Sequence, residues 1–288
     1  MRLALSLLAL PLLAAPPLVW TTGENQRYEL TENGKPVMVY HAGVETSPDA
    51  PPERARCCYI YPVYSPAGVS PLADFPKDHW HHRGVFWAWP YVETGGKVSD
   101  IWLVSGGIHH VTAAAPKTAT SSGNATLKAL NYWELDGKRI VREDASITVH
   151  ASKDDARTID LYLVFEALDT PVELRGSQDK GKSYGGLNVR FAAREGTKIR
   201  SSEGDVPKDT DYVTHRWAEL EGVYGGKRVA VRVEADPRNP HDPPQWCLRN
   251  YGFVGAAFPG RSESVSGFKL EKGKPLTLRY KVTLTDLP

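Results

Sequence analysis

The sequence predicts an all-β protein built as one large antiparallel β-sandwich. Apolar and polar residues alternate along many short segments, which is the pattern of half-buried strands. Turn dipeptides of the hairpin type separate these segments. The 25 Gly and 22 Pro residues interrupt the chain every few positions, and no segment after residue 19 has a 3.6-residue apolar period with helix caps. We therefore expect very little helix.

The first segment, residues 1–19, has the composition of a secretory signal peptide. Arg2 precedes the apolar run LALSLLALPLLAA. This run contains a proline and is shorter than the ~20 residues needed to cross a bilayer, so a membrane anchor is the weaker interpretation. We expect cleavage between Ala14 and Val19. The mature chain, residues 20–288, is then a single β-sandwich domain that spans no membrane and is periplasmic or secreted.

The strands and the turns between them follow from the same alternation. Three segments place their apolar side chains on one face, namely residues 159–165, 229–233 and 276–284. Four dipeptides can supply the positive φ angles of a tight hairpin, namely Asn33-Gly34, Gly95-Gly96, Asp136-Gly137 and Gly225-Gly226. Many antiparallel strands in one uninterrupted series predict a sandwich or a barrel.

The overall charge argues against nucleic acid as a partner. The chain has 35 Lys and Arg residues against 34 Asp and Glu residues, a net charge of +1, and no long basic stripe. Such a balance gives no sequence-independent attraction to a phosphate backbone.

The three cysteines leave two alternatives open. In an exported protein, one disulfide could join Cys247 to either Cys57 or Cys58, because adjacent residues of a strand point to opposite faces. Equally, all three thiols could be buried and unpaired. A zinc site on these residues is not expected, since the chain has no CxxC pair.

The most informative segment is Lys77–Trp89, KDHWHHRGVFWAW. In an extended conformation, His79, His81 and Arg83 would project to one side and His82 to the other. Gly84 would then allow a close approach of the backbone or a bend. Imidazole suits both proton transfer and metal binding. We take His81, His82 and Arg83 as candidate catalytic residues and His79 as a candidate binding residue.

A metal site is the alternative use of this histidine cluster. A His-x-His pair on a strand is typical of cupin metal sites, but the acidic residue that a cupin needs shortly afterwards is missing here. Asp100 could complete a facial triad with His79 and His81. We assign no metal ligand, leave the cofactor open, and keep Asp100 as a candidate substrate-binding residue.

Further candidates for substrate binding are aromatic and polar. Indole rings stack on the apolar faces of sugars, or else fill a core. In Lys182–Phe191, KSYGGLNVRF, alternation on a strand would place Tyr184, Asn188 and Arg190 on one face as a hydrogen-bonding wall. The remaining candidates are tryptophans, namely Trp87, Trp89, Trp102 and Trp246. The motifs of hydrolase elbows, dinucleotide sites, P-loops and zincins are absent from the sequence.

Several motifs together resemble one exported bacterial family, labelled PmoA-like or methane oxygenase PmoA. They are GKPVMVY at 34–40, CCYIYPVYSPAGV at 57–69, FPKDHWHHRGVFWAW at 75–89, KSYGGLNVRF and WCLRNYGF. The resemblance covers nearly the whole mature chain. It implies a sandwich similar to galactose-mutarotase-like folds and an occurrence beside sugar oxidoreductases. The resemblance does not imply methane monooxygenase activity, because the monooxygenase subunit of that name is embedded in a membrane. It also assigns no catalytic role to any residue of this chain.

Our leading hypothesis is an exported carbohydrate-active enzyme that uses histidine as general acid or base on a sugar or keto-sugar. It would be a lyase, a hydrolase, or an isomerase or epimerase. A hydrolase needs two placed carboxylates that the sequence does not reveal. The alternatives are a non-catalytic carbohydrate-binding module and a metal-dependent oxygenase. The expected partner is a small-molecule carbohydrate, and the oligomeric state stays open.

Overall fold

The protein is described here by a computed structural model, which covers residues 18–177, 179, 182–260 and 267–288. It consists of antiparallel β-sheets, so the predicted sandwich is confirmed. Over those residues there is no α-helix, only the short 3-10 helices η1 (Glu24–Gln26) and η2 (Pro52–Arg54). The predicted signal segment lies almost wholly outside the described residues, and strand β1 begins at Leu18.

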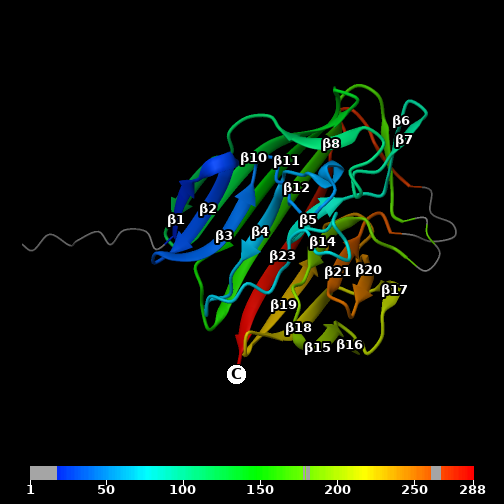
Figure 1. Ribbon diagram of the computed structural model, residues 1–288. Helices are drawn as coiled ribbons and strands as arrows, with labels where there is room; N and C mark the ends of the chain where they lie inside the picture. The colour runs from blue at the N-terminus through cyan, green and yellow to red at the C-terminus, as the bar shows by residue number, and fades with distance from the viewer. Residues whose placement is uncertain (1–17, 178, 180–181, 261–266) are drawn as a thin grey trace, which may run out of the picture.

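Two large sheets face each other, and a small third sheet lies beside them (Figure 1). The nine-stranded sheet has the order β1 (Leu18–Thr22), β2 (Arg27–Glu32), β3 (Lys35–His41), β4 (Tyr59–Val63), β5 (Val85–Ala88), β14 (Gly186–Arg190), β21 (Phe253–Ala257), β20 (Gln245–Arg249) and β17 (Thr210–Thr214). The ten-stranded sheet has the order β16 (Gly204–Asp205), β15 (Glu195–Ser201), β18 (Trp217–Tyr224), β19 (Lys227–Ala235), β23 (Leu276–Leu287), β12 (Ala156–Ala167), β11 (Lys138–His150), β10 (Asn124–Leu135) and β8 (Ile108–Thr112), with β9 (Lys117–Ser121) paired to β10. The small sheet has the order β22 (Phe268–Leu270), β13 (Val172–Arg175), β6 (Tyr91–Thr94) and β7 (Lys97–Ser99).

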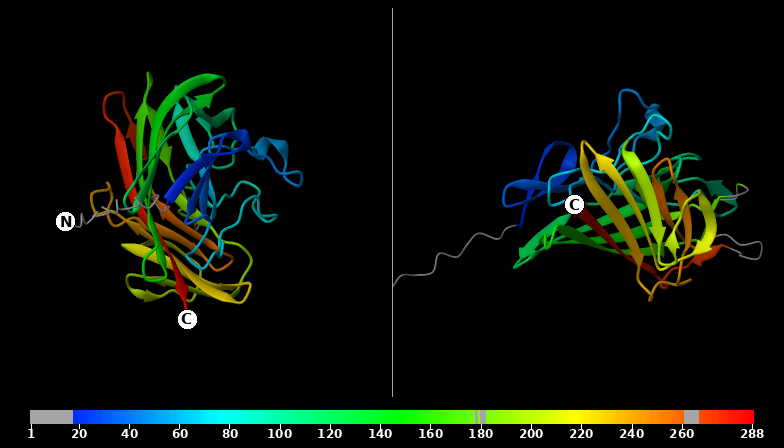
Figure 2. Two further views of the ribbon diagram at one scale, coloured as in Figure 1. Left: turned by 90° about the vertical axis from the view of Figure 1, so that its left-hand side faces the viewer. Right: turned by 90° about the horizontal axis from the view of Figure 1, so that it is seen from below.

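The core lies between the two large sheets. Figure 2 shows the N-terminal strands and the long strands β10–β12 as separate layers. Trp89, which follows β5, packs against Trp133 of β10 and Phe165 of β12, with ring centroids 5.3 and 5.2 Å away. The Trp89 indole N–H donates to the Phe258 carbonyl at 2.7 Å. Burial of these rings stabilises the contact between the sheets, and the indole N–H keeps its hydrogen bond.

The predicted strand faces and hairpins are confirmed. The apolar residues that alternate in β12, β19 and β23 are buried, while their neighbours are more exposed. Each of the four predicted dipeptides joins two paired strands and has positive φ at both residues. Asn33 and Gly34, for example, have φ of 50° and 76°. This geometry matches the twist of the flanking strands, so local sequence set these turns.

The cysteines follow the second of the two alternatives. Cys57, Cys58 and Cys247 are buried and unpaired. The Cys57 thiol donates to the His110 carbonyl at 3.3 Å, and the Cys58 sulfur lies 3.5 Å from the Thr112 hydroxyl. The three thiols therefore act as small core residues.

Candidate functional site

The histidine segment forms consecutive turns. The backbone N–H of His79 donates to the Pro76 carbonyl, and that of His82 donates to the His79 carbonyl, each at 2.9 Å. Strand β5 begins only at Val85, so the expectation of an extended segment with alternating faces is wrong. The two turn hydrogen bonds wind the backbone, which removes the alternation. We call residues 76–83 the histidine turn.

The histidine turn brings its three imidazoles together. The rings of His79 and His82 stack with centroids 4.5 Å apart and planes 8° apart. His81 stands edge-on to His82, also at 4.5 Å. A strand would have separated these rings, whereas the turn makes one cluster of them.

The cluster rests on an aromatic floor. His82 lies 5.9 Å from the Phe86 ring and 5.1 Å from the Phe253 ring, and Trp102 stands perpendicular to it at 5.5 Å. In the nine-stranded sheet, Phe86 pairs with Asn188, so both face the same side. The opposite face of this sheet carries the core that contains Trp89. The site therefore lies on the outer face of the central strands β5, β14 and β21.

Gly84 connects the histidine turn to the sheet. A Cβ atom at this position would lie 2.4 Å from the Ile60 carbonyl oxygen of β4. The backbone thus approaches β4 more closely than any side chain allows, as the sequence predicted.

Arg190 anchors the histidine turn to β14. Its Nη2 donates to both carboxylate oxygens of Asp78, at 2.8 and 2.7 Å. Tyr251 covers this pair, because its ring lies 4.7 Å from the Arg190 guanidinium and stacks on His79 at 5.0 Å. The side chains of His79 and Asp78 are 34% and 48% exposed, and Tyr251 is 42% exposed, so this end of the site is open to solvent.

Tyr184 forms the opposite end of the site. Its ring lies 4.5 Å from Trp102, which contacts His82. Tyr184 precedes β14, so only Asn188 and Arg190 share a strand face, but the tertiary structure still brings Tyr184 to the cluster. The structure therefore brings the histidine segment together with Trp102, Tyr184 and Arg190.

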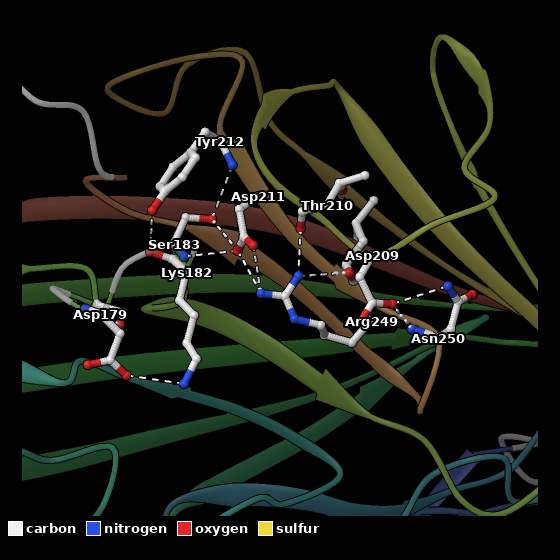
Figure 3. A network of polar contacts seen from close by, with 11 residues as sticks. Asp179, Lys182, Ser183, Asp209, Thr210, Asp211, Tyr212, Arg249 and Asn250 are labelled. Atoms are coloured by element: carbon white, nitrogen blue, oxygen red, sulfur yellow. Dashed lines mark hydrogen bonds and ion pairs between the residues drawn. The ribbon is translucent and has the colours of Figure 1, made fainter.

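A polar network supports the loops that carry Tyr184 and Tyr251 (Figure 3). Arg249 donates to both oxygens of Asp211 at 2.8 and 2.7 Å, and the Ser183 N–H donates to the same carboxylate at 3.1 Å. Ser183 and Arg249 are close in sequence to the two tyrosines. Charge-assisted hydrogen bonds of this kind hold both loops in place.

Arg83 is placed as a positioning residue. Its guanidinium is fully buried 3.4 Å above the Phe75 ring, and its Nε lies 3.4 Å from Asp74. Its Nη1 donates to the Trp80 and His82 carbonyls at 2.8 and 2.7 Å. These contacts hold the histidine turn from beneath, so Arg83 does not face a ligand as the sequence-based assignment required.

Six predicted binding residues are buried, namely Trp102 and Arg190 in the site described above and Trp87, Trp89, Trp246 and Asn188. The tryptophans Trp87, Trp89 and Trp246 are at most 1% exposed and offer no face to a ligand, because they fill the core. Asn188 lies in the floor, with its Nδ2 donating to the Gly186 carbonyl at 2.6 Å. Sequence patterning does not distinguish such tryptophans from surface ones.

The electrostatics of the site keep His81 and His82 neutral. Burial, together with the nearby charges of His79, Arg56 and Arg54, lowers the pKa of His81 to about 3. Burial, with His81 and His79, also lowers the pKa of His82 well below its usual value. Both rings are therefore neutral at neutral pH, so each keeps one unprotonated ring nitrogen.

Asp100 has the opposite perturbation. Burial raises its pKa to about 6, although backbone N–H groups of Leu103 and Trp102 and the charges of Arg56 and Arg54 act against this. The Leu103 N–H donates to Oδ1 at 2.7 Å. Asp100 thus retains a proton in mildly acidic solution, and it lies two residues before Trp102, whose ring contacts His81 and His82. Neighbouring groups whose pKa values are shifted in opposite directions are typical of acid and base pairs in active sites.

Sequence reasoning missed Arg56, Asp78 and Phe253 as members of the site. Each lies in a different segment. Asp78 and Phe253 fall inside the quoted motifs and Arg56 directly precedes one, but only the tertiary contacts show that they belong to the site. Within the described ranges, no group of three or more His, Cys, Asp or Glu residues has the arrangement of a metal site. The predicted triad of His79, His81 and Asp100 is therefore without support.

Comparison with known proteins gives a family. A family profile matches residues 27–287, and it is described as "Family of unknown function (DUF6807)". The chain belongs to this family. No curated protein matches the DUF6807 chain in sequence. The resemblance to PmoA-like proteins stays a prediction.

Two solved structures are similar to the DUF6807 chain. One, from the human microbiome, is described as a kojibiose phosphorylase; it shares 9% identity at a TM-score of 0.36, over 76% of this chain and 23% of that chain. This chain thus spans less than a quarter of it. The other is a GalM/aldose epimerase homologue from C. elegans, with 7% identity at a TM-score of 0.36, over 95% and 100% of the two chains. At these TM-scores neither likeness carries an argument about function. Across the described residues, no helix is long and apolar enough to cross a membrane.

Proposed function

We propose that this protein is an exported carbohydrate-active enzyme that moves protons on a keto-sugar. The observation that carries the proposal is the imidazole cluster of the histidine turn, packed on Trp102 two residues after Asp100, with the exposed Tyr251 ring at its open end. The exposed face of an aromatic ring such as Tyr251 can bind the apolar face of a sugar ring. The proposal of export rests on the composition of residues 1–19, and N-terminal sequencing of the mature protein tests it.

In this mechanism His81 is the general base and Asp100 the general acid. His81 removes the proton from the carbon next to the substrate carbonyl, and Asp100 gives its proton to the carbonyl oxygen, which produces an enediol. To give the epimer, water delivers a proton to the other face of that carbon, Asp100 takes its proton back from the enediol oxygen, and His81 releases its proton to solvent. In elimination, His81 gives its proton to the departing group on the next carbon while Asp100 takes its proton back as the carbonyl re-forms. His82 stacks between His79 and Phe253 and fixes the orientation of His81.

The test is exchange of a substrate hydrogen with solvent. The wild type is incubated with methyl 3-keto-glucoside and with 5-keto-gluconate in D2O, and proton NMR follows deuterium incorporation next to the carbonyl. We expect exchange with the wild type and a loss of at least about 100-fold in His81→Gln, which is the usual contribution of general base catalysis. His109→Gln is the matched control, since the His109 side chain is 49% exposed and lies outside the site.

Two outcomes contradict the proposal. Exchange that persists in His81→Gln removes the assigned base. Binding of the sugars without any exchange or product in the wild type favours the carbohydrate-binding module instead.

A further inference from the structure

Arg56 is a buried cation that interacts electrostatically with Asp100 but has no direct ion-pair partner among the described residues. It is 4% exposed, and its Nη2 donates to the backbone carbonyls of Ile101 and Trp102. Its Nε and Nη1 have no hydrogen-bond partner in the part of the chain that the structure describes. No carboxylate of the described residues forms an ion pair with it. An unpaired buried charge is costly, so a fold retains one where something else supplies the opposite charge.

The guanidinium of Arg56 lies in the floor of the site. Its Cζ is 5.5 Å from the centre of the Phe86 ring, and Phe86 contacts Trp102 at 5.3 Å and His82 at 5.9 Å. Its charge also acts on His81 and Asp100, whose pKa values it lowers. Arg56 is thus close to both groups of the proposed acid and base pair.

The charges around the site leave a positive excess. Arg83 is balanced by Asp74 at 3.4 Å, and Arg190 is balanced by Asp78 at 2.7 Å. A second arginine, Arg54, donates to the Leu103 carbonyl and, like Arg56, forms no ion pair with any described residue. These two cations face the single acid Asp100, so one positive charge remains even when Asp100 is ionised.

We propose that Arg56 binds a carboxylate of the substrate, so that the substrate class is a sugar acid that also carries a carbonyl group. This inference rests on the proposed function and names its substrate. A carboxylate has one negative charge and balances the excess. A phosphate ester carries about −1.5 to −2 charges at pH 7 and would overcompensate it.

Calorimetric titration at fixed ionic strength tests the inference with three probes: D-glucuronate, methyl glucoside and glucose 6-phosphate. We expect the wild type to bind glucuronate at least about tenfold more tightly than either other sugar, a difference of about 1.4 kcal/mol. Equal binding of methyl glucoside, or tighter binding of glucose 6-phosphate, overturns the inference without any variant.

Variants then assign the effect to Arg56. Arg56→Met should lose the preference for glucuronate, and Arg56→Lys should keep part of it because the charge remains. Arg142→Gln is the matched control, since Arg142 is an exposed arginine paired with Asp144. A preference that survives in folded Arg56→Met overturns the assignment. If Arg56→Met does not fold, an unchanged preference in Arg56→Lys also overturns it, because a guanidinium and an ammonium bind carboxylates differently.

The experiments distinguish failure of this inference about carboxylate binding from failure of the proposed enzymatic function. Glucuronate should bind His81→Gln as tightly as the wild type, because His81 supplies chemistry and Arg56 supplies recognition. Tight Arg56-dependent binding without deuterium exchange on any keto-sugar supports the inference and contradicts the enzyme. Exchange on methyl 3-keto-glucoside that equals exchange on 5-keto-gluconate supports the enzyme and contradicts the inference.

Discussion

Arg190 of β14 holds Asp78 of the histidine turn through two hydrogen bonds that join residues 112 positions apart in sequence. Burial raises the pKa of Asp78, but the hydrogen bonds from Arg190 and His79 outweigh it and lower the pKa overall. The carboxylate is therefore ionised and keeps the turn against the sheet. This contact explains how a turn of polar residues stays ordered on the outer face of a β-sandwich.

Replacement of Asp78 by Asn should uncouple the histidine turn from β14. We expect proton exchange to fall at least about tenfold, because small misplacements of catalytic groups are costly. The free energy of unfolding should change by no more than about 1 kcal/mol, since this ion pair is partly exposed. Exchange kinetics and chemical denaturation measure the two effects. Asp160→Asn is the control, since Asp160 pairs with His150 away from the site. Unchanged exchange kinetics in Asp78→Asn would refute the anchoring role.

The pH dependence of catalysis should report Asp100. Burial raises its pKa to about 6, so the protonated acid is lost as pH rises through that value. We expect kcat/KM to fall on this limb in the wild type. Asp100→Asn retains an oxygen for the Leu103 N–H but cannot donate the proton, so its rate should be about 100-fold lower and free of this limb.

Stability gives an independent check on Asp100. Because its folded-state pKa is raised, folding favours the protonated form, and stability from this group is lost as pH rises from the ordinary carboxyl range through about 6. The wild type should therefore lose unfolding free energy over this pH range while Asp100→Asn does not, so the stability of the variant relative to the wild type should rise. Denaturant titrations at several pH values measure this, and parallel curves would show that the pKa of Asp100 is the same in the folded and unfolded states.

Glu143 should be the most sensitive polar residue of the core. Asn131 and the Trp133 indole donate to its two oxygens at 2.8 Å each, and His110 Nε2 lies 3.3 Å away. Glu143→Gln turns one acceptor into a donor that faces another donor, so we expect a loss of about 3 kcal/mol of unfolding free energy. Denaturation measures it, with the exposed Asp144→Asn as control. A loss that matches the control would show that the network contributes little.

The same carboxylate should make the protein sensitive to acid. Burial acts to raise the pKa of Glu143, but His110, Trp133 and Asn131 lower it overall. Its contribution to stability is therefore present above the ordinary glutamate pKa and is lost as pH falls through the lower folded-state value. The difference between wild type and Glu143→Gln should shrink in that acidic range, which thermal unfolding at low pH can follow.

The three thiols should be inert in the folded protein. Burial raises the pKa of Cys247 to about 12 and that of Cys58 well above its usual value, so few thiolates form. Ellman's reagent should react slowly with the native protein and should find three thiols after unfolding without reductant. A single reactive thiol in the unfolded protein would instead indicate a disulfide.

The sequence by itself determined the local structure of this protein. Alternation set the buried faces of β12, β19 and β23, and dipeptides such as Asp136-Gly137 set the hairpins, because both depend on residues that are neighbours in the chain. The site is different. The path of the histidine turn, the burial of Arg83 and the core position of Trp89 depend on partners far away in sequence. Arg56, just before β4, and Tyr251, just before β21, join the histidines only because sheet pairing brings β4, β5, β14 and β21 together, and no local pattern encodes which distant strands will meet.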